Sequence, residues 1–357
     1  MSIPAPSVSK SRGSPYYFVS YPDGQPIAIQ CDHSELLVQR DASAASFSSH
    51  WKVESVANGV TLKWRSSHSG RVDVPELLAA TEATLSLHPE APELVLRIPE
   101  TPDTDLLASG LLLANGHGLF ITREMFWQQA RMWLPNVSAP FALQYTMTEG
   151  RRHPRRPPKS KCVVYRRFIP WLGKTFSFRV IDLACDLDRF SRWMNDPSVA
   201  RFWQEEGSIE KHRNYLKTIA EDSHMQSLIA CLDDEPFAYF EVYWAKENRI
   251  APYYDAHDYD RGWHVLVGES AFRGKLFATA WLTSISHYLF LDDPRTQRVV
   301  GEPRSDHVQQ IRNLDRSGFA KIKEFDFPHK RALLISMLRE RFFGEQLWLP
   351  QKEAPAP

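Results

Sequence analysis

The chain contains little cysteine and no cysteine motif. Only four of its 357 residues are cysteines, and no two of them form a Cys-x-x-Cys pair. This wide spacing gives no disulfide framework and no thiolate zinc site. Scattered thiols in a chain of this size are typical of a reducing compartment. The four are Cys31, Cys162, Cys185 and Cys231.

Neither sign of charge predominates, and long apolar runs are absent. The 43 Lys and Arg residues balance the 43 Asp and Glu residues, which argues against a general nucleic-acid binder. No segment approaches about 18 consecutive apolar residues, so we expect no membrane span. Residues 1–15 lack the apolar core of a secretory signal. We therefore expect a cytoplasmic protein.

Apolar and aromatic residues are plentiful, and the length allows two domains. The chain is 43% hydrophobic and has 11 tryptophans, while a domain takes roughly 100–200 residues. A basic stretch at 150–161 contains three prolines, which disfavour helix and central strand. We predict a solvated linker there, with a role near an anionic ligand as the alternative. The predicted organisation is disordered tails at 1–15 and 349–357 and domains at 16–149 and 162–348.

Hydrophobic periodicity predicts an α/β (α+β) protein with a mixed sheet. The first half has no concentrated polar motif, and its function is not readable from the residues. There we expect strands at 16–21, 26–30, 59–65 and 93–99 and helices at 74–85 and 121–132. In the second half we expect strands at 175–182, 227–232, 236–245, 263–269 and 295–303, a strand or strand pair at 318–328, and helices at 187–195, 208–220, 275–291 and 307–317.

One strand of the second half carries a charged residue between two tyrosines. In the segment FAYFEVYW, a period of two places Tyr239, Glu241 and Tyr243 on one face and the apolar residues on the other. The apolar face is expected in the core. The tyrosine face is either half solvated or lines a pocket that recognises an amine-bearing ligand.

A second strand is followed by a basic glycine loop. In WHVLVGE, residues His264, Leu266 and Gly268 share a face, and Arg273-Gly274-Lys275 then opens a helix. Free amides at a helix N-terminus, together with the helix dipole, favour a phosphate. His264 is then either a core residue or a neighbour of the group that carries the phosphates.

The segment GEPRSDH ends a third strand with acidic residues. Asp306 is either the N-cap of the following helix or a site residue at the end of a strand next to that of His264, where such sheets bind ligands. A metal site at His257, Asp258, Asp260 and His264 is disfavoured, because it lacks helical spacing and a partner cluster. A Ser-His-Asp triad is disfavoured, because no Gly-x-Ser-x-Gly elbow is present.

The strand, Arg-Gly-Lys loop and helix resemble the GNAT acetyltransferase superfamily. That superfamily's acyl-CoA loop reads Arg/Gln-x-x-Gly-x-Gly/Ala, and Arg273 and Ala278 match its ends, whereas Leu276 stands at the central glycine. More specific segments resemble the hydroxamate-siderophore acyltransferases over about 155–343. They are RWMNDPSVARFW (192–203), PFAYFEVYWAKENRI (236–250), DRGWHVLVGE (260–269), HYLFLDDPRTQRV (287–299), EPRSD (302–306) and KEFDFPHKRA (323–332).

The resemblance implies an acyl-CoA-dependent N-acyltransferase, with acetyl-CoA as the expected cosubstrate and no metal. Its acceptor would be an N-hydroxylated diamino acid, N6-hydroxylysine or N5-hydroxyornithine, and its product a hydroxamate. It implies the GNAT fold for 162–348 and a degenerate second copy of that fold for 16–149. In such proteins His264 and Asp306 would be the catalytic pair, although His307 stands where relatives usually have Asn. Acylation of an unmodified amine and an inactive CoA-binding scaffold are the alternatives, and the oligomeric state is unknown.

The resemblance and the strand patterns together give the candidate site residues. We expect the acyl-CoA to be bound by Leu266, Val267, Gly268, Arg273, Gly274, Lys275 and Ala278. We expect the acceptor to be bound by Trp203, Glu241, Tyr243 and Asp260.

Overall fold

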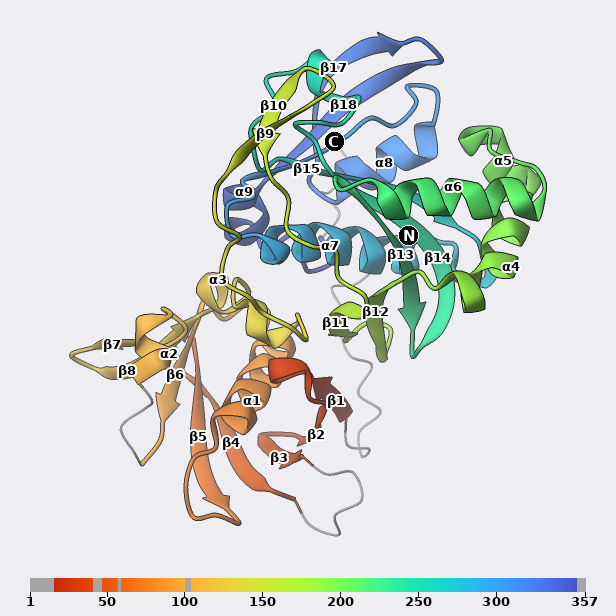
Figure 1. The fold of residues 1–357 in the computed structure, drawn as a ribbon. Coiled ribbons are helices and arrows are strands. Elements are labelled where there is room, and N and C mark those ends of the chain that lie inside the picture. Colours follow the sequence, from red (N-terminus) through yellow and green to blue (C-terminus); the bar gives the residue numbers. More distant parts are fainter. Residues whose placement is uncertain (1–15, 41–46, 57–58, 100–103, 352–357) are drawn as a thin grey trace, which may run out of the picture. The chain divides into compact units, whose positions relative to one another are not determined.

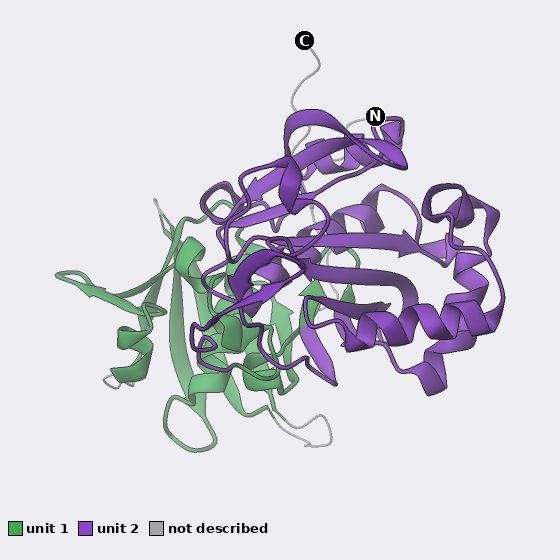
Figure 2. Ribbon diagram, turned by 45° about the horizontal axis from the view of Figure 1, so that its top comes forward, with its two compact units in different colours: residues 1–137, 166–175 green, residues 138–165, 176–357 purple. Residues whose placement is uncertain are grey.

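The computed structural model describes residues 16–40, 47–56, 59–99 and 104–351. The chain divides into two compact units, which Figure 2 shows in different colours. Unit 1 comprises 1–137 and 166–175, and unit 2 comprises 138–165 and 176–357. The tails predicted at 1–15 and 349–357 lie outside the described residues, apart from 349–351.

Unit 1 is built on one eight-stranded sheet. Its strands are β1 (Tyr16–Ser20), β2 (Ile27–Asp32), β3 (Glu35–Gln39), β4 (Ser49–Val56), β5 (Gly59–Ser67), β6 (Glu93–Arg97), β7 (Leu113–Asn115) and β8 (Gly118–Thr122). Its helices are α1 (Val74–Leu87), α2 (Thr104–Ala108) and α3 (Arg123–Phe126), with 3-10 turns at Pro22–Gly24 and Ala130–Met132. The strand order is β1-β2-β3-β4-β5-β6-β8-β7, and only β5 and β6 pair in parallel. Helix α1 makes the crossover that a parallel pair requires.

Unit 2 is built on a second eight-stranded sheet and a separate two-stranded ribbon. The ribbon pairs β9 (Tyr145–Thr148) with β10 (Arg151–Pro154). The sheet contains β11 (Val163–Ile169), β12 (Lys174–Val180), β13 (Met225–Leu232), β14 (Glu235–Trp244), β15 (Arg261–Val267), β16 (Arg298–Gly301), β17 (Ala320–Phe327) and β18 (Lys330–Leu338). The helices are α4 (Leu183–Met194), α5 (Pro197–Trp203), α6 (Ile209–Glu221), α7 (Lys275–Asp292), α8 (Val308–Arg316) and α9 (Arg339–Gly344), with 3-10 turns at Ala251–Tyr253 and Ser270–Phe272.

Helices cover both faces of the unit 2 sheet (Figure 1). On one face, α4 and α6 pack over Ile229, Tyr239 and Leu266. On the other, Trp281 of α7 packs against Phe240 and Trp263. The period-two pattern of FAYFEVYW therefore separates two different surroundings, and its tyrosine face lies on the α4 and α6 side.

The two sheets share one topology. The order in unit 2 is β11-β12-β13-β14-β15-β16-β18-β17, so in both units the first six strands are sequential and the last two are exchanged. In both, the fifth and sixth strands form the parallel pair, and a long helix connects them along the chain. They differ at that pair, because β5 and β6 share four residue pairs whereas β15 and β16 share only two.

The two long helices also begin differently. In α1 the side chain of Asp73 accepts from the amide of Glu76 and so caps the helix. In α7 the residue before the helix is Gly274, with φ of 124°, which has no side chain to act as an N-cap. A carboxylate therefore caps α1, whereas the N-cap residue of α7 offers no such group.

The predicted helix at 121–132 is not formed as a single helix. Helix α3 ends at Phe126. Contacts of Arg123 and of two tryptophans hold this segment in another conformation. The Arg123 guanidinium donates to the carbonyls of Leu85, His88 and Ala91. Trp127 then stacks on Trp133 with ring centroids 4.6 Å apart. The helical spacing of apolar residues here reflects packing around these aromatic rings.

The predicted linker at 150–161 is likewise folded into unit 2. Its beginning forms β10, and Arg156 makes a bidentate pair with Glu247, a buried side chain. Arg151 donates to the carbonyls of Glu247 and Asn248 at 2.8 and 2.7 Å. Arg156 of this segment is therefore neutralised inside the unit, whereas Arg152, Arg155 and Lys161 are exposed. Within the described ranges, no helix has both the length and the apolar character to cross a membrane.

Glu82 on α1 makes the stability of unit 1 depend on pH. Its buried carboxyl accepts from Ser20 and, at 3.0 Å, from Trp133 Nε1. Burial raises its pKa from 4.5 to about 7. The contribution of protonated Glu82 to the free energy of unfolding is therefore fully present below pH 4.5. It is lost as the pH rises toward 7, by at most about 1.4 kcal/mol per pH unit.

We expect Glu82→Gln to flatten this pH dependence. Urea unfolding followed by tryptophan fluorescence at about pH 5 and about pH 8 measures the loss for each protein. The wild type should lose more stability than the variant between these values, since the other titrating groups are common to both. Equal losses would contradict a buried carboxyl with a raised pKa.

Candidate active site

The register of β14 and β15 places Glu241 directly opposite His264. Directly opposed residues of an antiparallel pair lie on the same face, so the two polar positions predicted on separate strands come together. The neighbouring pair is Tyr243 with Gly262. A Cβ atom at Gly262 would lie 2.2 Å from the Tyr243 ring, which explains why glycine precedes the Trp263-His264 pair.

The divergence of β15 from β16 supplies a second carboxylate. The parallel pairing joins Arg261 to Val299 and Gly262 to Val300 and then stops. Continuing that register by two residues brings His264 level with Glu302, which follows the last residue of β16. His264 Nε2 lies 2.8 Å from Glu302 Oε1, and Nδ1 lies 2.9 Å from Glu241 Oε2. The imidazole thus links three strands through its two nitrogens.

Both nitrogens of His264 face groups that accept hydrogen bonds. Because an ionised carboxylate only accepts, both contacts are satisfied when the ring carries two protons. Burial opposes a charge on His264, but Glu302 and Glu241 outweigh it and raise its pKa above the ordinary 6.5. Burial likewise opposes a charge on Glu302, yet His264 holds the pKa of this carboxyl below its usual range. The substrate-free site therefore favours an imidazolium between two carboxylates.

Buried tyrosines fix the positions of the two carboxylates. Tyr215 of α6 and Tyr239 of β14 donate to Glu241 Oε1, and Tyr243 donates to Glu302 Oε2 at 2.7 Å. Burial and the neighbouring carboxylates raise the pKa of all three tyrosines. They therefore remain protonated donors, and each carboxylate keeps one oxygen for His264.

The Glu241–His264–Glu302 triad lies on the wall of a cleft of about 980 Å³. The imidazole is the exposed member, because 20% of its side chain is accessible against 3% for Glu241 and 0% for Glu302. Aromatic and cationic side chains complete the cleft, which a drug-sized ligand would fill. Among those lining it are Phe202, Trp203, Tyr215, Arg249, Arg304, His307, His329 and Lys330.

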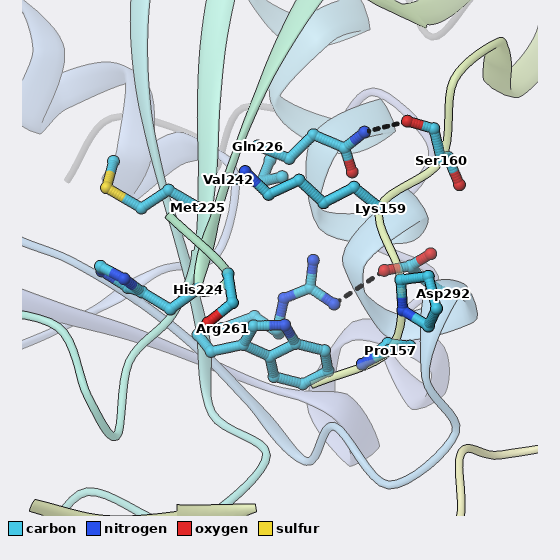
Figure 3. A pocket seen from close by; sticks show the side chains of 12 residues that line it. Pro157, Lys159, Ser160, His224, Met225, Gln226, Val242, Arg261 and Asp292 are labelled. Carbon is cyan, nitrogen blue, oxygen red and sulfur yellow. Dashed lines mark hydrogen bonds and ion pairs between the residues drawn. The ribbon is translucent and has the colours of Figure 1, made fainter. Parts of the chain in front are cut away.

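A second cavity near Arg261 is too small for such a ligand (Figure 3). Its volume of about 60 Å³ corresponds to about two water molecules. Arg261 pairs with Asp292 at 2.8 Å and lies over the Trp244 ring at 4.0 Å. This cavity is a gap beside a structural ion pair.

The expected pairing of His264 with Asp306 is not formed. Asp306 is 67% exposed and makes a bidentate pair with Arg304, at 3.0 and 2.9 Å. The Arg304 guanidinium lowers the pKa of Asp306. Its place beside His264 is taken by Glu302, which the sequence presents four positions earlier in the same segment. The side-chain cap of α8 is His307, not Asp306.

Two of the four expected acceptor-binding residues line the cleft, namely Trp203 and Glu241. Trp203 donates to the carbonyl of Val265 at 3.3 Å and meets the His264 ring edge-on. Tyr243 lies beneath that ring and is fully buried. Asp260 is a structural residue, because it is buried and bound by Arg298, Tyr254 and the amide of His257.

The expected acyl-CoA residues lie on β15 and at the start of α7. The amide of Gly268 already donates to the carbonyl of Phe237 at 3.0 Å, so it is not available to a thioester. Alternate residues of a strand direct their polar groups to opposite sides. The carbonyls of Val265 and Val267 accept from Trp203 and Arg273, so the amides of these two valines face away from β14.

The remaining loop residues lie around the start of α7. Arg273, Gly274 and Lys275 are exposed, and Leu266 is buried in the sheet. Ala278 lies one turn into α7, where its amide already bonds to Gly274. Glycine is required at 268, because a Cβ there would lie 2.2 Å from the Trp193 ring. In the described part of the chain, no group of three or more His, Cys, Asp or Glu side chains could hold a metal ion.

Comparisons with known proteins agree on one family. Residues 182–327 match the model of the acetyltransferase (GNAT) domain. The chain is 43% identical to an N(6)-hydroxylysine O-acetyltransferase of Escherichia coli, over 63% of this chain and 72% of that protein. It is 42% identical to an N(5)-hydroxyornithine:cis-anhydromevalonyl coenzyme A-N(5)-transacylase of Beauveria bassiana, over 62% of this chain and 57% of that one.

A solved structure is also similar. It is an uncharacterized protein from Bacillus halodurans, 27% identical, with a TM-score of 0.50. The match covers 53% of this chain and 96% of that one.

The triad predicts an unusual titration for His264. Two-dimensional NMR of the histidine rings, assigned with a His264→Gln variant, should give His264 a pKa above 6.5. Glu302→Gln should lower that pKa, because it removes a negative charge 2.8 Å from Nε2. A His264 pKa below 6.5 in the wild type would contradict the double carboxylate contact.

Proposed function

Because the chain belongs to the GNAT acyltransferase family that includes the N(6)-hydroxylysine O-acetyltransferase of Escherichia coli, we propose that it acylates an N-hydroxylated diamino acid. The acyl donor is an acyl-coenzyme A, with acetyl-CoA the simplest, and the acceptor is N6-hydroxylysine or N5-hydroxyornithine. The product is a hydroxamate, an iron-chelating group of siderophores. The observation that carries the proposal is the triad, which combines an exposed imidazole with two fixed carboxylates in a cleft.

The reaction is a direct attack on the thioester. The hydroxylamine nitrogen forms a bond to the acyl carbon, the carbon–sulfur bond breaks, and the nitrogen loses one proton while the coenzyme A thiolate gains one. A hydroxylamine is less basic than an alkylamine, so more of it is neutral near pH 7. The site therefore needs a base only as the new bond forms.

His264 is the group that accepts this proton. With a deprotonated ring, one of its nitrogens no longer donates to its carboxylate and is available to the incoming nitrogen. Glu241 and Glu302 then stabilise the imidazolium that results. Because the two carboxylates raise the pKa of His264, activity rises as the pH increases through a value above 6.5.

The acyl group is held on the side of β15 that faces away from β14. The amides of Val265 and Val267 are the candidate donors to the thioester oxygen, in place of Gly268. The start of α7, with Arg273 and Lys275, is the candidate site for the coenzyme A phosphates.

Unit 1 is a degenerate copy of the same fold. Its sheet has the same strand order as unit 2, which supports a common origin. Two features would prevent it from acting as a second site. Its parallel strands stay paired over four residues, and Asp73 fills the N-terminus of its long helix.

The first test compares acceptors. With acetyl-CoA, we expect far higher kcat/KM for N6-hydroxylysine or N5-hydroxyornithine than for lysine or ornithine, since the free amines are largely protonated near pH 7. Thiol release measures turnover, and a coloured ferric complex reports acylation on nitrogen, because an O-acyl hydroxylamine is not a hydroxamate. Equal turnover of lysine and N6-hydroxylysine would refute the proposed acceptor. Thiol release without a ferric complex would place the acyl group on oxygen.

The second test separates the two acidic candidates. Loss of a general base or its partner typically costs about 10²–10⁴ in rate, so His264→Gln and Glu302→Gln should lower kcat in that range. Asp306→Asn is the matched control and should stay close to the wild type. Melting temperatures recorded alongside identify a loss caused by unfolding. An Asp306→Asn variant as slow as Glu302→Gln would restore Asp306 as the partner of His264.

The third test concerns the donor. Lys275→Ala should raise the KM for acetyl-CoA and leave kcat nearly unchanged, because a phosphate contact is equal in the ground state and the transition state. The same measurement on Arg273→Ala complements it. An unchanged KM in both variants would place the phosphates elsewhere.

A further inference from the structure

Two cationic side chains and a histidine surround Phe327, beside Glu302. The guanidinium of Arg249 lies 5.6 Å from the Phe327 ring centroid, and Lys330 Nζ lies 5.4 Å from it. His329 stacks on the same ring with centroids 5.5 Å apart. Arg249, His329 and Lys330 all line the cleft. We call Arg249 and Lys330 the cationic wall.

The two cations of the cationic wall have few carboxylate contacts among the described residues. Lys330 donates to the backbone carbonyl of Glu302 and has no carboxylate contact among the described residues. Arg249 is 51% exposed, and among the described residues its carboxylate contact is Glu302 at 3.5 Å, at the limit of a hydrogen bond. The oxygens of Glu302 are already bound by His264 and Tyr243. Arg249 therefore lines the cleft without a close ion pair in the described part of the chain.

Other cations of the cleft are already neutralised or bound. Arg304 forms its bidentate pair with Asp306. Arg151 donates to two backbone carbonyls. Among the described residues, Arg249 is therefore a cleft arginine held neither by a close ion pair nor by backbone carbonyls, and a half-exposed guanidinium fits a planar carboxylate.

We propose that the cationic wall binds the α-carboxylate of the acceptor, with Arg249 as the principal contact. This inference rests on the proposed function and narrows its substrate class. The acceptor is an amino acid that keeps its carboxylate, and a decarboxylated N-hydroxy diamine is a poor substrate. Lys330 supplies positive potential rather than a fork of donors.

The experiment compares two acceptors that differ by one group. N6-hydroxylysine and N-hydroxycadaverine have the same chain and hydroxylamine, and the second has hydrogen in place of the carboxylate. The wild type should prefer N6-hydroxylysine in kcat/KM, and Arg249→Gln should reduce that preference at least about tenfold, as for loss of a charged hydrogen bond. Arg249 also lies near Glu302, but that effect acts on both acceptors and cancels in the ratio.

Two further variants control for charge. Arg331→Gln removes a positive charge from β18, the strand that also carries Lys330. Arg331 pairs with Glu324 and does not line the cleft, so this variant should keep the wild-type preference. Arg249→Lys should restore part of it. If Arg249→Gln leaves the preference for N6-hydroxylysine unchanged, the proposal is overturned. If the KM for acetyl-CoA rises as well, the cationic wall binds the acyl donor instead of the acceptor.

Calorimetric binding of the two acceptors separates this inference from the proposed function. If Arg249→Gln weakens binding of N6-hydroxylysine but not of N-hydroxycadaverine, the carboxylate site stands even if no acyl transfer is detected. If neither protein distinguishes the two compounds in binding, the carboxylate site is refuted, whatever the turnover.

Discussion

The contact of one imidazole with two carboxylates is the interaction on which the candidate active site depends. His264 can reach both Glu241 and Glu302 only because β14 pairs fully with β15 while β16 leaves it after two residues. Placing charged groups in a sheet is costly unless each is paired. The tyrosines supply the remaining hydrogen bonds, and Gly262 makes room for one of them. The triad therefore requires this local packing as much as its own three residues.

The two units show how small differences in one topology decide whether a site exists. Both sheets have the same strand order and a helix between their parallel strands. In unit 1 the parallel strands stay together and a carboxylate caps the helix. In unit 2 the strands separate and the helix begins at Gly274, which has no side chain to act as an N-cap. Strand separation exposes backbone amides, and a helix N-terminus attracts an anion.

The charges of the cleft suit a zwitterionic acceptor. The triad can take up a proton at the reacting nitrogen, and Arg249 lines the same cleft with its guanidinium half exposed. The triad and the cationic wall both depend on Glu302, which contacts His264 through its side chain and Lys330 through its backbone carbonyl. Binding of the acceptor and proton transfer would thus be organised around the end of a single strand, β16.

The sequence by itself predicted the elements of unit 2 from β12 to β17, apart from α5, and missed β9, β10, β11, β18 and α9. A period of two placed Glu241 and His264 on polar faces, and the Arg-Gly-Lys loop marked the start of α7. Tertiary structure decided which groups meet. Glu302 and Asp306 are four residues apart in one segment, and only the register of β16 against β15 selects Glu302. The segment 121–132 was mispredicted for the same reason, because Arg123 binds carbonyls that are distant in sequence, and in 150–161 Arg156 likewise finds a distant partner in Glu247. Local patterns fix the conformation of a segment, whereas its long-range partners depend on the packing of the whole unit.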